Sequence, residues 1–126
     1  MQSKTILSLV LGSGAMLLAP FASSHTKADA VAGRAAFEKR CTGCHALDRD
    51  KEGPRLAGVL GRKAGTVSTF PYSNALKKSA VVWNEQALDK WLSDPDSLVP
   101  DSDMAFRLNS PGERAAIIAF LKETGK

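Results

Sequence analysis

The stretch at residues 40–45, RCTGCH, decides which fold this chain adopts. It contains both cysteines of the 126-residue chain, Cys41 and Cys44, and one of its two histidines, His45. Three kinds of chemistry place cysteines and a histidine this close together: a dithiol that exchanges disulfides, part of a metal site, or a point of covalent haem attachment. The rest of the sequence has to distinguish between them.

The first thirty residues have the pattern of an export signal. Lys4 gives a positive start, residues 6–18 form an apolar run of 13 residues, and small-residue cleavage sites end at Ser24 and Ala30. The run is shorter than the roughly 20 apolar residues that span a bilayer. We therefore predict a signal peptide at residues 1–30, cleaved after Ser24 or Ala30, and a periplasmic protein with no stable membrane insertion after cleavage.

Charge and length set limits on the remaining domain, residues 31–126. The formal charge of +4 becomes +3 when Lys4 is removed, because Lys27 and Asp29 cancel. This charge is small and mixed with acids, which argues against a nucleic-acid-binding protein. Cleavage after Ala30 leaves 126 − 30 = 96 residues. A chain this short has little hydrophobic core, so a large apolar cofactor would help to hold it together.

The periodicity predicts an all-α fold of about four to five helices joined by long loops. No run alternates apolar and polar residues for long enough to predict a strand. The first helix is expected to begin near Asp29 or Val31 and to continue into residues 40–45. Gly33 lowers the stability of that helix, which indicates close packing against another helix.

The middle of the chain is rich in helix breakers. Residues 51–82 contain four glycines and two prolines, which leaves room only for short turns of helix near residues 56–60 and 73–78. A segment this long without regular structure is unusual in a compact domain unless it surrounds something.

The later helices have clear boundaries. Asn84 is suited to cap one helix, which Pro95 ends. The final helix begins with Ser110 at the N-cap, Pro111 at N1 and Glu113 at N3, the pattern of a capping box.

Two of the three chemistries explain the cysteine motif poorly. A structural zinc site needs four ligands, and residues 31–126 contain only Cys41, Cys44 and His45 of the cysteine and histidine type. A dithiol oxidoreductase places its cysteines at a helix start among strands, and no strands are predicted here. The dithiol hypothesis also leaves His45 without a role.

Covalent haem attachment explains every residue of the motif. Cys41 and Cys44 lie about one helical turn apart, so each can form a thioether with one vinyl group of the porphyrin. His45 returns to the same face and can place a ring nitrogen on the iron. The sequence therefore predicts one haem c, attached through two thioethers.

The second axial ligand follows by elimination. If the signal is removed, Met104 is the only methionine left and His45 the only histidine. The alternative is that Met104 fills a gap in the core, as most methionines do. Its turn-rich, polar setting, residues 99–104, favours ligation of the iron instead.

With these ligands located, the chain resembles a class I c-type cytochrome with one haem, of the mitochondrial and bacterial type. The similarity covers nearly all of residues 31–126. Beyond the haem motif and Met104 it rests on Gly33, Phe37, residues 53–56, 61–65 and 70–72, Trp83, Pro95, Pro100, Phe106 and residues 118–122.

The resemblance implies the cytochrome c fold and several further roles. The Pro54 carbonyl would accept a hydrogen bond from His45, which fixes the tautomer of the imidazole. Tyr72 and Trp83 would donate hydrogen bonds to a buried haem propionate, and Arg62 would offset its charge. Gly33 and Phe37 would pack the first helix across the last one, near Phe120.

The sequence departs from the family in two places. Four acids and no base lie between Lys90 and Arg107, whereas mitochondrial members carry lysines around the methionine loop that dock an acidic partner. Trp91 stands where a tyrosine is common beside the methionine sulphur, and an indole donates a hydrogen bond without accepting one. A basic face elsewhere would use Arg40, Lys63, Lys77 and Lys78.

The predicted function is transfer of single electrons by a haem that cycles between Fe(II) and Fe(III), with no catalytic residues and no enzyme activity. The expected partners are an oxidase, a reductase or a dehydrogenase, and the carrier is expected to be monomeric. One alternative is a haem subunit of a periplasmic dehydrogenase or oxidase complex. Another is a haem enzyme or sensor in which a small molecule replaces Met104.

Overall fold

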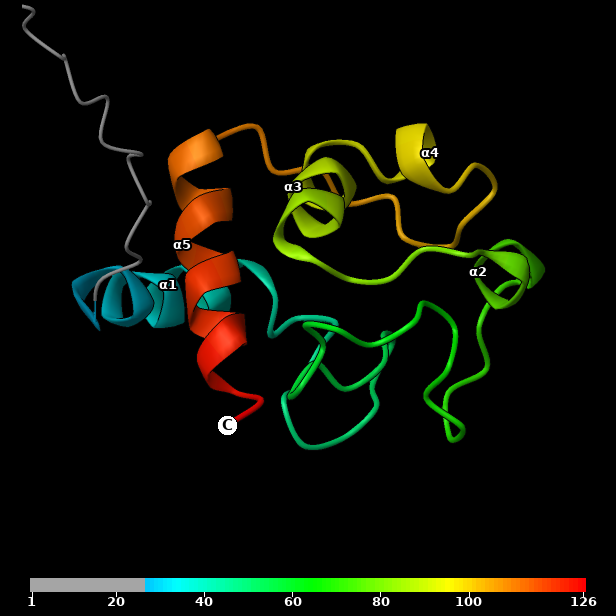
Figure 1. Ribbon diagram of the computed structural model, residues 1–126, viewed down its shortest axis with the longest axis horizontal. Coiled ribbons are helices and arrows are strands. Elements are labelled where there is room, and N and C mark those ends of the chain that lie inside the picture. Colours follow the sequence, from blue (N-terminus) through cyan, green and yellow to red (C-terminus); the bar gives the residue numbers. More distant parts are fainter. Residues whose placement is uncertain (1–26) are drawn as a thin grey trace, which may run out of the picture.

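The computed structural model describes residues 27–126, and these form an all-α fold, as predicted (Figure 1). Most of the predicted signal peptide lies outside the described residues. The helices are α1 (Lys27–Arg40), α2 (Asn74–Lys78), α3 (Glu85–Ser93), α4 (Pro95–Leu98) and α5 (Pro111–Glu123). Over residues 27–126 the extended pairing is limited to one isolated antiparallel bridge, between Lys63 and Val82. In the same part of the chain, no helix has the length and apolar character needed to cross a membrane.

Helices α1 and α5 cross in direct contact (Figure 1). A Cβ atom on Gly33 would lie 1.9 Å from the Ala116 carbonyl oxygen, so the backbones meet at a distance that only glycine permits. The rings of Phe37 and Phe120 pack beside this point with centroids 5.3 Å apart. The predicted packing of the first helix on the last is therefore present.

Helix α3 is capped as the sequence predicts. The Asn84 side chain accepts a 2.7 Å hydrogen bond from the Ala87 N–H, and Leu88, Trp91 and Leu92 form the buried face. Pro95 does more than end this helix. It begins α4, since a proline at the first helical position loses no intrahelical bond.

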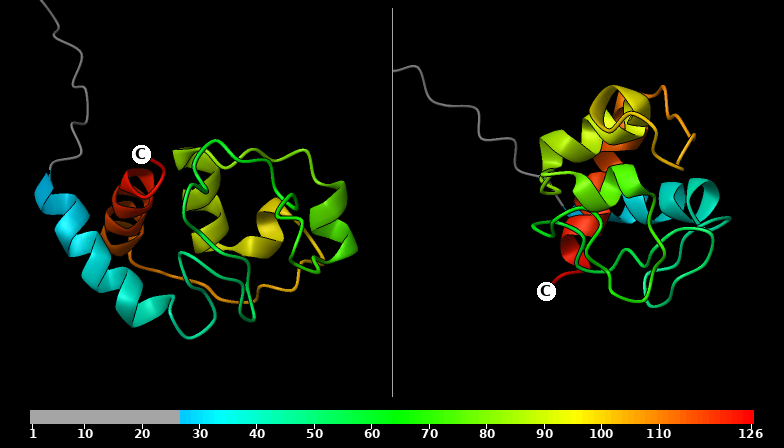
Figure 2. Two further views of the ribbon diagram at one scale, coloured as in Figure 1. Left: turned by 90° about the horizontal axis from the view of Figure 1, so that it is seen from below. Right: turned by 90° about the vertical axis from the view of Figure 1, so that its right-hand side faces the viewer.

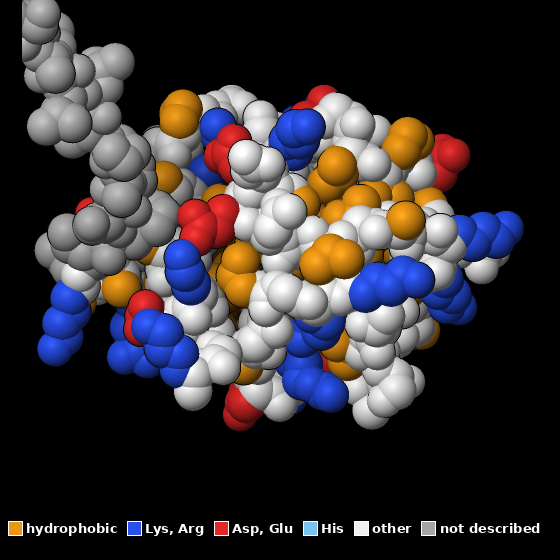
Figure 3. All heavy atoms as spheres, viewed as in Figure 1, with side chains coloured by type: hydrophobic (Ala, Val, Ile, Leu, Met, Phe, Trp, Pro, Cys, Tyr) orange, Lys and Arg blue, Asp and Glu red, His pale blue; other side chains and the backbone are white. Residues whose placement is uncertain are grey.

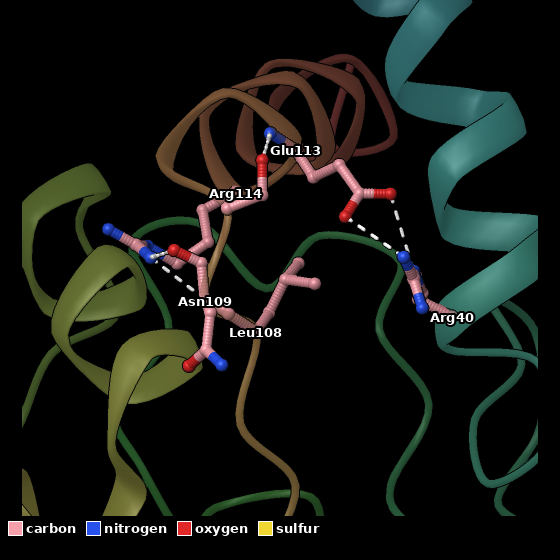
Figure 4. A network of polar contacts seen from close by, with 6 residues as sticks. Arg40, Leu108, Asn109, Glu113 and Arg114 are labelled. Atoms are coloured by element: carbon pink, nitrogen blue, oxygen red, sulfur yellow. Dashed lines mark hydrogen bonds and ion pairs between the residues drawn. The ribbon is translucent and has the colours of Figure 1, made fainter.

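The predicted capping box of α5 is only half formed. The Ser110 hydroxyl accepts a 3.2 Å hydrogen bond from the Glu113 N–H, as expected. The Glu113 carboxylate, however, points toward Arg40 at the end of α1 and accepts hydrogen bonds of 3.2 and 3.3 Å (Figure 4). This ion pair joins the start of α5 to the residue that precedes the cysteine motif.

A buried arginine fixes the segment that leads into α5. The Arg114 guanidinium donates to the carbonyls of Leu108 and Asn109 at 2.8 and 3.2 Å (Figure 4). It also donates to Asp89 of α3 at 2.7 Å. Arg114 thereby ties α3, α5 and the chain between them together.

The long middle segment forms turns where a short helix was predicted. Residues 56–60 form turns and no helix, because Gly58 and Gly61 adopt positive φ angles of 70° and 85° that a right-handed helix excludes. The second predicted helical turn does form, as α2, with the Ser73 hydroxyl accepting from the Leu76 N–H.

Candidate functional site

A cavity of about 300 Å³ lies between the cysteine motif, the middle loops, α3, the Met104 segment and α5. In the left view of Figure 2, the ribbons of the middle loops, α3 and the segment that precedes α5 are arranged in a ring. Its lining is mostly apolar and includes Leu56, Val59, Leu88, Leu92 and Ile117.

The cysteine motif continues the turn at the end of α1. The Cys41 N–H donates to the Phe37 carbonyl at 2.8 Å, and the N–H groups of Cys44 and His45 donate to the Cys41 carbonyl at 3.1 and 2.8 Å. Both cysteines line the cavity, and neither is paired in a disulfide. Burial raises the pKa of Cys41 to about 11, whereas Cys44 is exposed. The helical turn therefore presents both sulphurs and the imidazole to one cavity.

His45 is held from two directions. Its Nδ1 lies 2.8 Å from the Pro54 carbonyl oxygen, so Nδ1–H donates and Nε2 keeps a free lone pair. Burial lowers the pKa of His45, which favours the neutral ring that binds metals. A Cβ atom on Gly53 would lie 2.2 Å from the His45 Cε1 atom. Gly53 is thus needed because the imidazole rests on its backbone.

Met104 lines the same cavity from a segment remote in sequence. The indole N–H of Trp91 donates to its sulphur at 3.1 Å. Trp91 itself packs on Trp83, with ring centroids 5.2 Å apart. The sequence suggested that an indole beside the sulphur would act as a donor, and this contact is present.

Three further residues that the resemblance implies also line the cavity: Arg62, Tyr72 and Trp83. Arg62 donates to the backbone carbonyls of Arg55 and Ala57 at 2.8 and 3.3 Å, and burial lowers its pKa. Burial also raises the pKa of Tyr72, which keeps its hydroxyl protonated. These side chains add a guanidinium, a phenol and an indole to the otherwise mostly apolar lining.

Sequence reasoning missed Ser102. Its hydroxyl oxygen is buried and has no hydrogen-bond partner among the described residues, although it lies only two positions before Met104. A buried hydroxyl without a partner is costly, but Ser102 is not among the residues that line the cavity. A serine among the aspartates of this turn carried no signal that could have marked it in the sequence.

The segment around Met104 carries fewer unpaired acidic side chains than the sequence suggested. Arg107 donates to Asp94 at 2.8 and 3.0 Å and contacts Asp96 at 3.4 Å, so two of the four acids are paired. Arg40 is also occupied, by Glu113. Lys77 and Lys78 lie in the last turn of α2, at an end of the molecule where several Lys and Arg side chains lie beside hydrophobic ones (Figure 3).

These features fit a large planar group with apolar faces and a charged edge. The apolar lining suits the faces, and Arg62 and Tyr72 suit the edge. The free Nε2 of His45 and the sulphur of Met104 are the nitrogen and thioether donors that haem iron accepts. An all-α fold with a Cys-x-x-Cys-His segment and a methionine around one such cavity is a class I c-type cytochrome.

Comparisons with known proteins agree. The family model described as Cytochrome c matches residues 30–125. Cytochrome c2 iso-2 of Magnetospirillum fulvum is 45% identical over 85 residues, which cover 65% of this chain and 88% of that protein. Cytochrome c of Tetrahymena pyriformis is 45% identical over 96 residues, covering 75% and 87% of the two chains. The solved structure of cytochrome cH from Methylobacterium extorquens superposes with a TM-score of 0.71 at 41% identity, covering 75% of this chain and 98% of that one.

The chain belongs to the cytochrome c family. It is a single-electron carrier with one covalently attached haem c, and it exchanges electrons with redox partners.

Proposed function

We propose that Cys41 and Cys44 hold the haem through thioethers and that His45 and Met104 are its two axial ligands. The observation that carries this assignment is the single apolar cavity that all four side chains line, three from one helical turn and one from a segment about sixty residues later. When bound, the haem supplies an iron that alternates between Fe(II) and Fe(III).

The chain's own residues set the properties of this centre. The hydrogen bond from His45 to Pro54 holds the ring in one tautomer and makes its other nitrogen more basic. Arg62, Tyr72 and Trp83, which line the cavity, would meet the propionates. A buried thioether ligand and an apolar surround both favour Fe(II), so the reduction potential is expected to be high among haem proteins.

Such a centre has no place for a substrate. If His45 and Met104 both bind the iron, as proposed, they would occupy the positions at which a substrate could bind. The relatives bear the names of cytochromes c, and an electron carrier without enzyme activity or catalytic residues is the function that this arrangement supports.

We further propose that residues 1–30 are a cleaved signal peptide, that residues 31–126 are the mature domain, and that the carrier works in the periplasm. The apolar run at residues 6–18 and the small residues at Ser24 and Ala30 support export. The partners would be an oxidase, a reductase or a dehydrogenase, met by a monomeric carrier.

Absorption spectra and mass spectrometry test the assignment. The denatured wild-type protein should keep one haem in its measured mass, and the reduced native protein should bind carbon monoxide slowly. Met104→Ala should bind carbon monoxide rapidly and have a lower potential. Leu108→Ala, a buried residue of the same segment that does not line the cavity, is the control and should bind slowly. Rapid binding by the wild-type protein, or a Met104→Ala variant that behaves like wild type, would exclude Met104 as a ligand.

A further inference from the structure

Positive charge is concentrated in the middle of the chain. Residues 53–84 contain five Lys and Arg residues and no Asp or Glu, which gives this segment a formal charge of +5. The domain at residues 31–126 carries +3, so the rest of the domain carries 3 − 5 = −2. The small net charge therefore hides a basic segment within an acidic remainder.

Three of the five cations are exposed and unpaired. Lys63, Lys77 and Lys78 are exposed, and within residues 27–126 none of them forms an ion pair with an acidic side chain. The other two, Arg55 and Arg62, are half-buried and donate hydrogen bonds within the segment. The three lysines are thus the cations that a partner can reach.

Backbone contacts bring these lysines to one surface. Lys63 forms the antiparallel bridge with Val82, and the side chains of such a pair lie on one face with Cβ atoms roughly 5 Å apart. The chain two residues later packs on α2, since a Cβ atom on Gly65 would lie 3.0 Å from the Lys77 Cα atom. The end of α2, with Lys77 and Lys78, therefore lies beside the bridge. We call Lys63, Lys77, Lys78 and Val82 the basic surface.

An exposed aliphatic side chain belongs to this surface. Val82 is 48% exposed, whereas most large hydrophobic side chains of residues 27–126 are buried or half-buried. At the α2 end of the molecule in Figure 3, Lys and Arg side chains lie beside hydrophobic ones. An apolar centre with a charged rim is the usual composition of a protein docking surface.

The basic surface adjoins the wall of the haem cavity. Arg62 and Trp83 line the cavity, and they are the chain neighbours of Lys63 and Val82. The Trp83 N–H donates to the Arg62 carbonyl at 2.9 Å, so these two segments form one continuous piece of wall. A partner on the basic surface is separated from the cavity by this piece of wall.

The exposed charged side chains that line the cavity itself have the opposite sign. Glu52 and Asp103 are exposed, and neither forms an ion pair within the described part of the chain. Arg40, the exposed base among the lining residues, is paired with Glu113. An acidic partner is therefore repelled by those side chains and attracted by the basic surface.

We propose that the basic surface docks an acidic redox protein, and that electrons pass between the haem and that partner beside Arg62 and Trp83. One electron moves from Fe(II) to the oxidised partner, or from the reduced partner to Fe(III), and no bond forms or breaks. An anionic membrane fits less well, because it would need more exposed apolar surface than one valine provides. This inference rests on the electron-carrier function and names the kind of protein that meets the haem.

The test uses a plant-type [2Fe–2S] ferredoxin as the probe, a small acidic protein whose low potential allows it to reduce the haem. Stopped flow measures the second-order rate at 0.1 M ionic strength, where the screening length is about 10 Å. Lys63→Gln/Lys77→Gln/Lys78→Gln should lower this rate about tenfold, the lower end of the range for electrostatic steering. The difference from wild type should vanish at 1 M, where the screening length is about 3 Å.

The control variant removes the same charge at three exposed lysines elsewhere, Lys39→Gln/Lys90→Gln/Lys126→Gln. Its rate with ferredoxin should fall less than twofold. Photoreduced lumiflavin, a small uncharged reductant, should reduce wild type and both variants at equal rates, because it needs no charged docking surface.

Cross-linking locates the contact directly. A carbodiimide joins a lysine amine to a carboxylate as an amide where the two groups touch, and mass spectrometry identifies the joined peptides. With ferredoxin, the wild-type protein should be cross-linked at Lys63, Lys77 or Lys78 and not at Lys39. Vesicles of equal parts phosphatidylglycerol and phosphatidylcholine should leave most of the wild-type protein unbound at 0.1 M salt.

Three results would overturn the docking surface: equal slowing of both triple variants, cross-links at Lys39 in place of the basic surface, or strong vesicle binding that the Lys63→Gln/Lys77→Gln/Lys78→Gln variant loses. The first would assign the effect to net charge, the second to another face and the third to a membrane. If neither ferredoxin nor lumiflavin reduces the wild-type protein, the carrier function itself fails and the docking surface falls with it.

Discussion

At the crossing of α1 and α5 side chains contact one another directly, whereas around the cavity they face an open volume of about 300 Å³. The crossing is formed by two regular helices that meet at Gly33, Phe37 and Phe120. The cavity wall is mostly loop, held by single hydrogen bonds such as those from Leu56 to Ala46 and from Ala57 to Leu47, each 3.0 Å. The first region is stabilised by the chain itself, and the second depends on the group it encloses.

The largest effect is expected when that group is removed. At about 24 cal/mol per Å³, a cavity of about 300 Å³ costs about 7 kcal/mol if it stays empty. This cost is comparable with the whole stability of a small domain. The Cys41→Ser/Cys44→Ser chain, prepared without haem, should therefore lose amide protection throughout residues 46–84 but retain part of it in α1 and α5, as measured by hydrogen exchange.

Gly43→Ala is the control for that experiment. It lies between the two cysteines, and a Cβ atom there would have no neighbour within 4 Å. It should keep its haem and its protection. Equal protection of residues 46–84 with and without haem would contradict the dependence of these loops on the group.

The second-largest effect is expected at the crossing of α1 and α5. Gly33→Ala places a Cβ atom 1.9 Å from the Ala116 carbonyl oxygen, a backbone atom that moves only if the helices separate. The free energy of unfolding should fall by about 3 kcal/mol, the upper part of the range for overpacking. Chemical denaturation measures this, and the potential should change little because the crossing lies away from the cavity. A stabilised variant, which helix propensity alone would predict, would show that the helices do not meet as described.

Gly53→Ala should change the haem site more than the stability, which is the reverse of what is expected for Gly33→Ala. The new Cβ atom would lie 2.2 Å from the His45 Cε1 atom, and a ring can tilt where a backbone cannot. We expect a loss of about 1 kcal/mol in the free energy of unfolding. The absorption spectrum and the potential should change as the imidazole and its bond to Pro54 are displaced. A spectrum identical to wild type would mean that the imidazole does not rest on Gly53.

The ion pairs at Arg107 should have a smaller effect. They close the segment that carries Met104 onto Asp94 and Asp96, but all three side chains are partly exposed, which limits their contribution to about 1 kcal/mol. Arg107→Gln should speed displacement of Met104 by imidazole about threefold, and the difference should vanish at 1 M salt, where the screening length is about 3 Å.

Lys122→Gln provides the matched control for Arg107→Gln. It removes the same charge and breaks a similar surface pair, with Glu85, on a different part of the molecule. Its displacement rate should equal that of wild type. Equal acceleration in both variants would assign the effect to net charge and not to the Arg107 contacts.

The smallest effect concerns one loop carboxylate. Hydrogen bonds from the Thr69 hydroxyl and the Arg55 N–H lower the pKa of Asp50. A lowered folded-state pKa adds stability above the unfolded value of about 3.9, and this is lost as the pH falls through the folded value. Thr69→Val should raise the pKa of Asp50 in an NMR titration. Thr66→Val, whose hydroxyl bonds the Lys63 carbonyl, should leave it unchanged.

The sequence predicted the helices because their determinants are local. The Asn84 cap, the Ser110 cap and the proline at position 111 act within one turn of chain, and each forms as expected. Gly33 predicted close packing because glycine lowers the stability of a helix, so its presence inside one indicates a close neighbour. The prediction of a helical turn at residues 56–60 was wrong because the sequence does not distinguish a glycine with a positive φ from one that merely permits a turn.

The site was predicted where its chemistry was distinctive and missed where it depended on tertiary contacts. Cysteines and a histidine at fixed spacing, with one methionine to complement them, indicated the cavity's main residues. Arg107 carried no such pattern, since its importance comes from Asp94 and Asp96, which folding brings beside it. The partner of Glu113 was misjudged for the same reason: a nearby backbone N–H was expected, but Arg40 competes for it from across the fold.

The most direct test of the difference between the two regions is the position of the Met104 methyl group in the reduced, haem-loaded protein. NMR of protein with ¹³C-methyl methionine, assigned through Met104→Leu, measures it. If Met104 completes the cavity as an axial ligand, its methyl group lies over the face of the porphyrin, and the ring current should shift its resonance far upfield of ordinary methionine values. A Met104 methyl resonance at an ordinary shift would contradict axial ligation and leave the cavity with His45 alone on the iron.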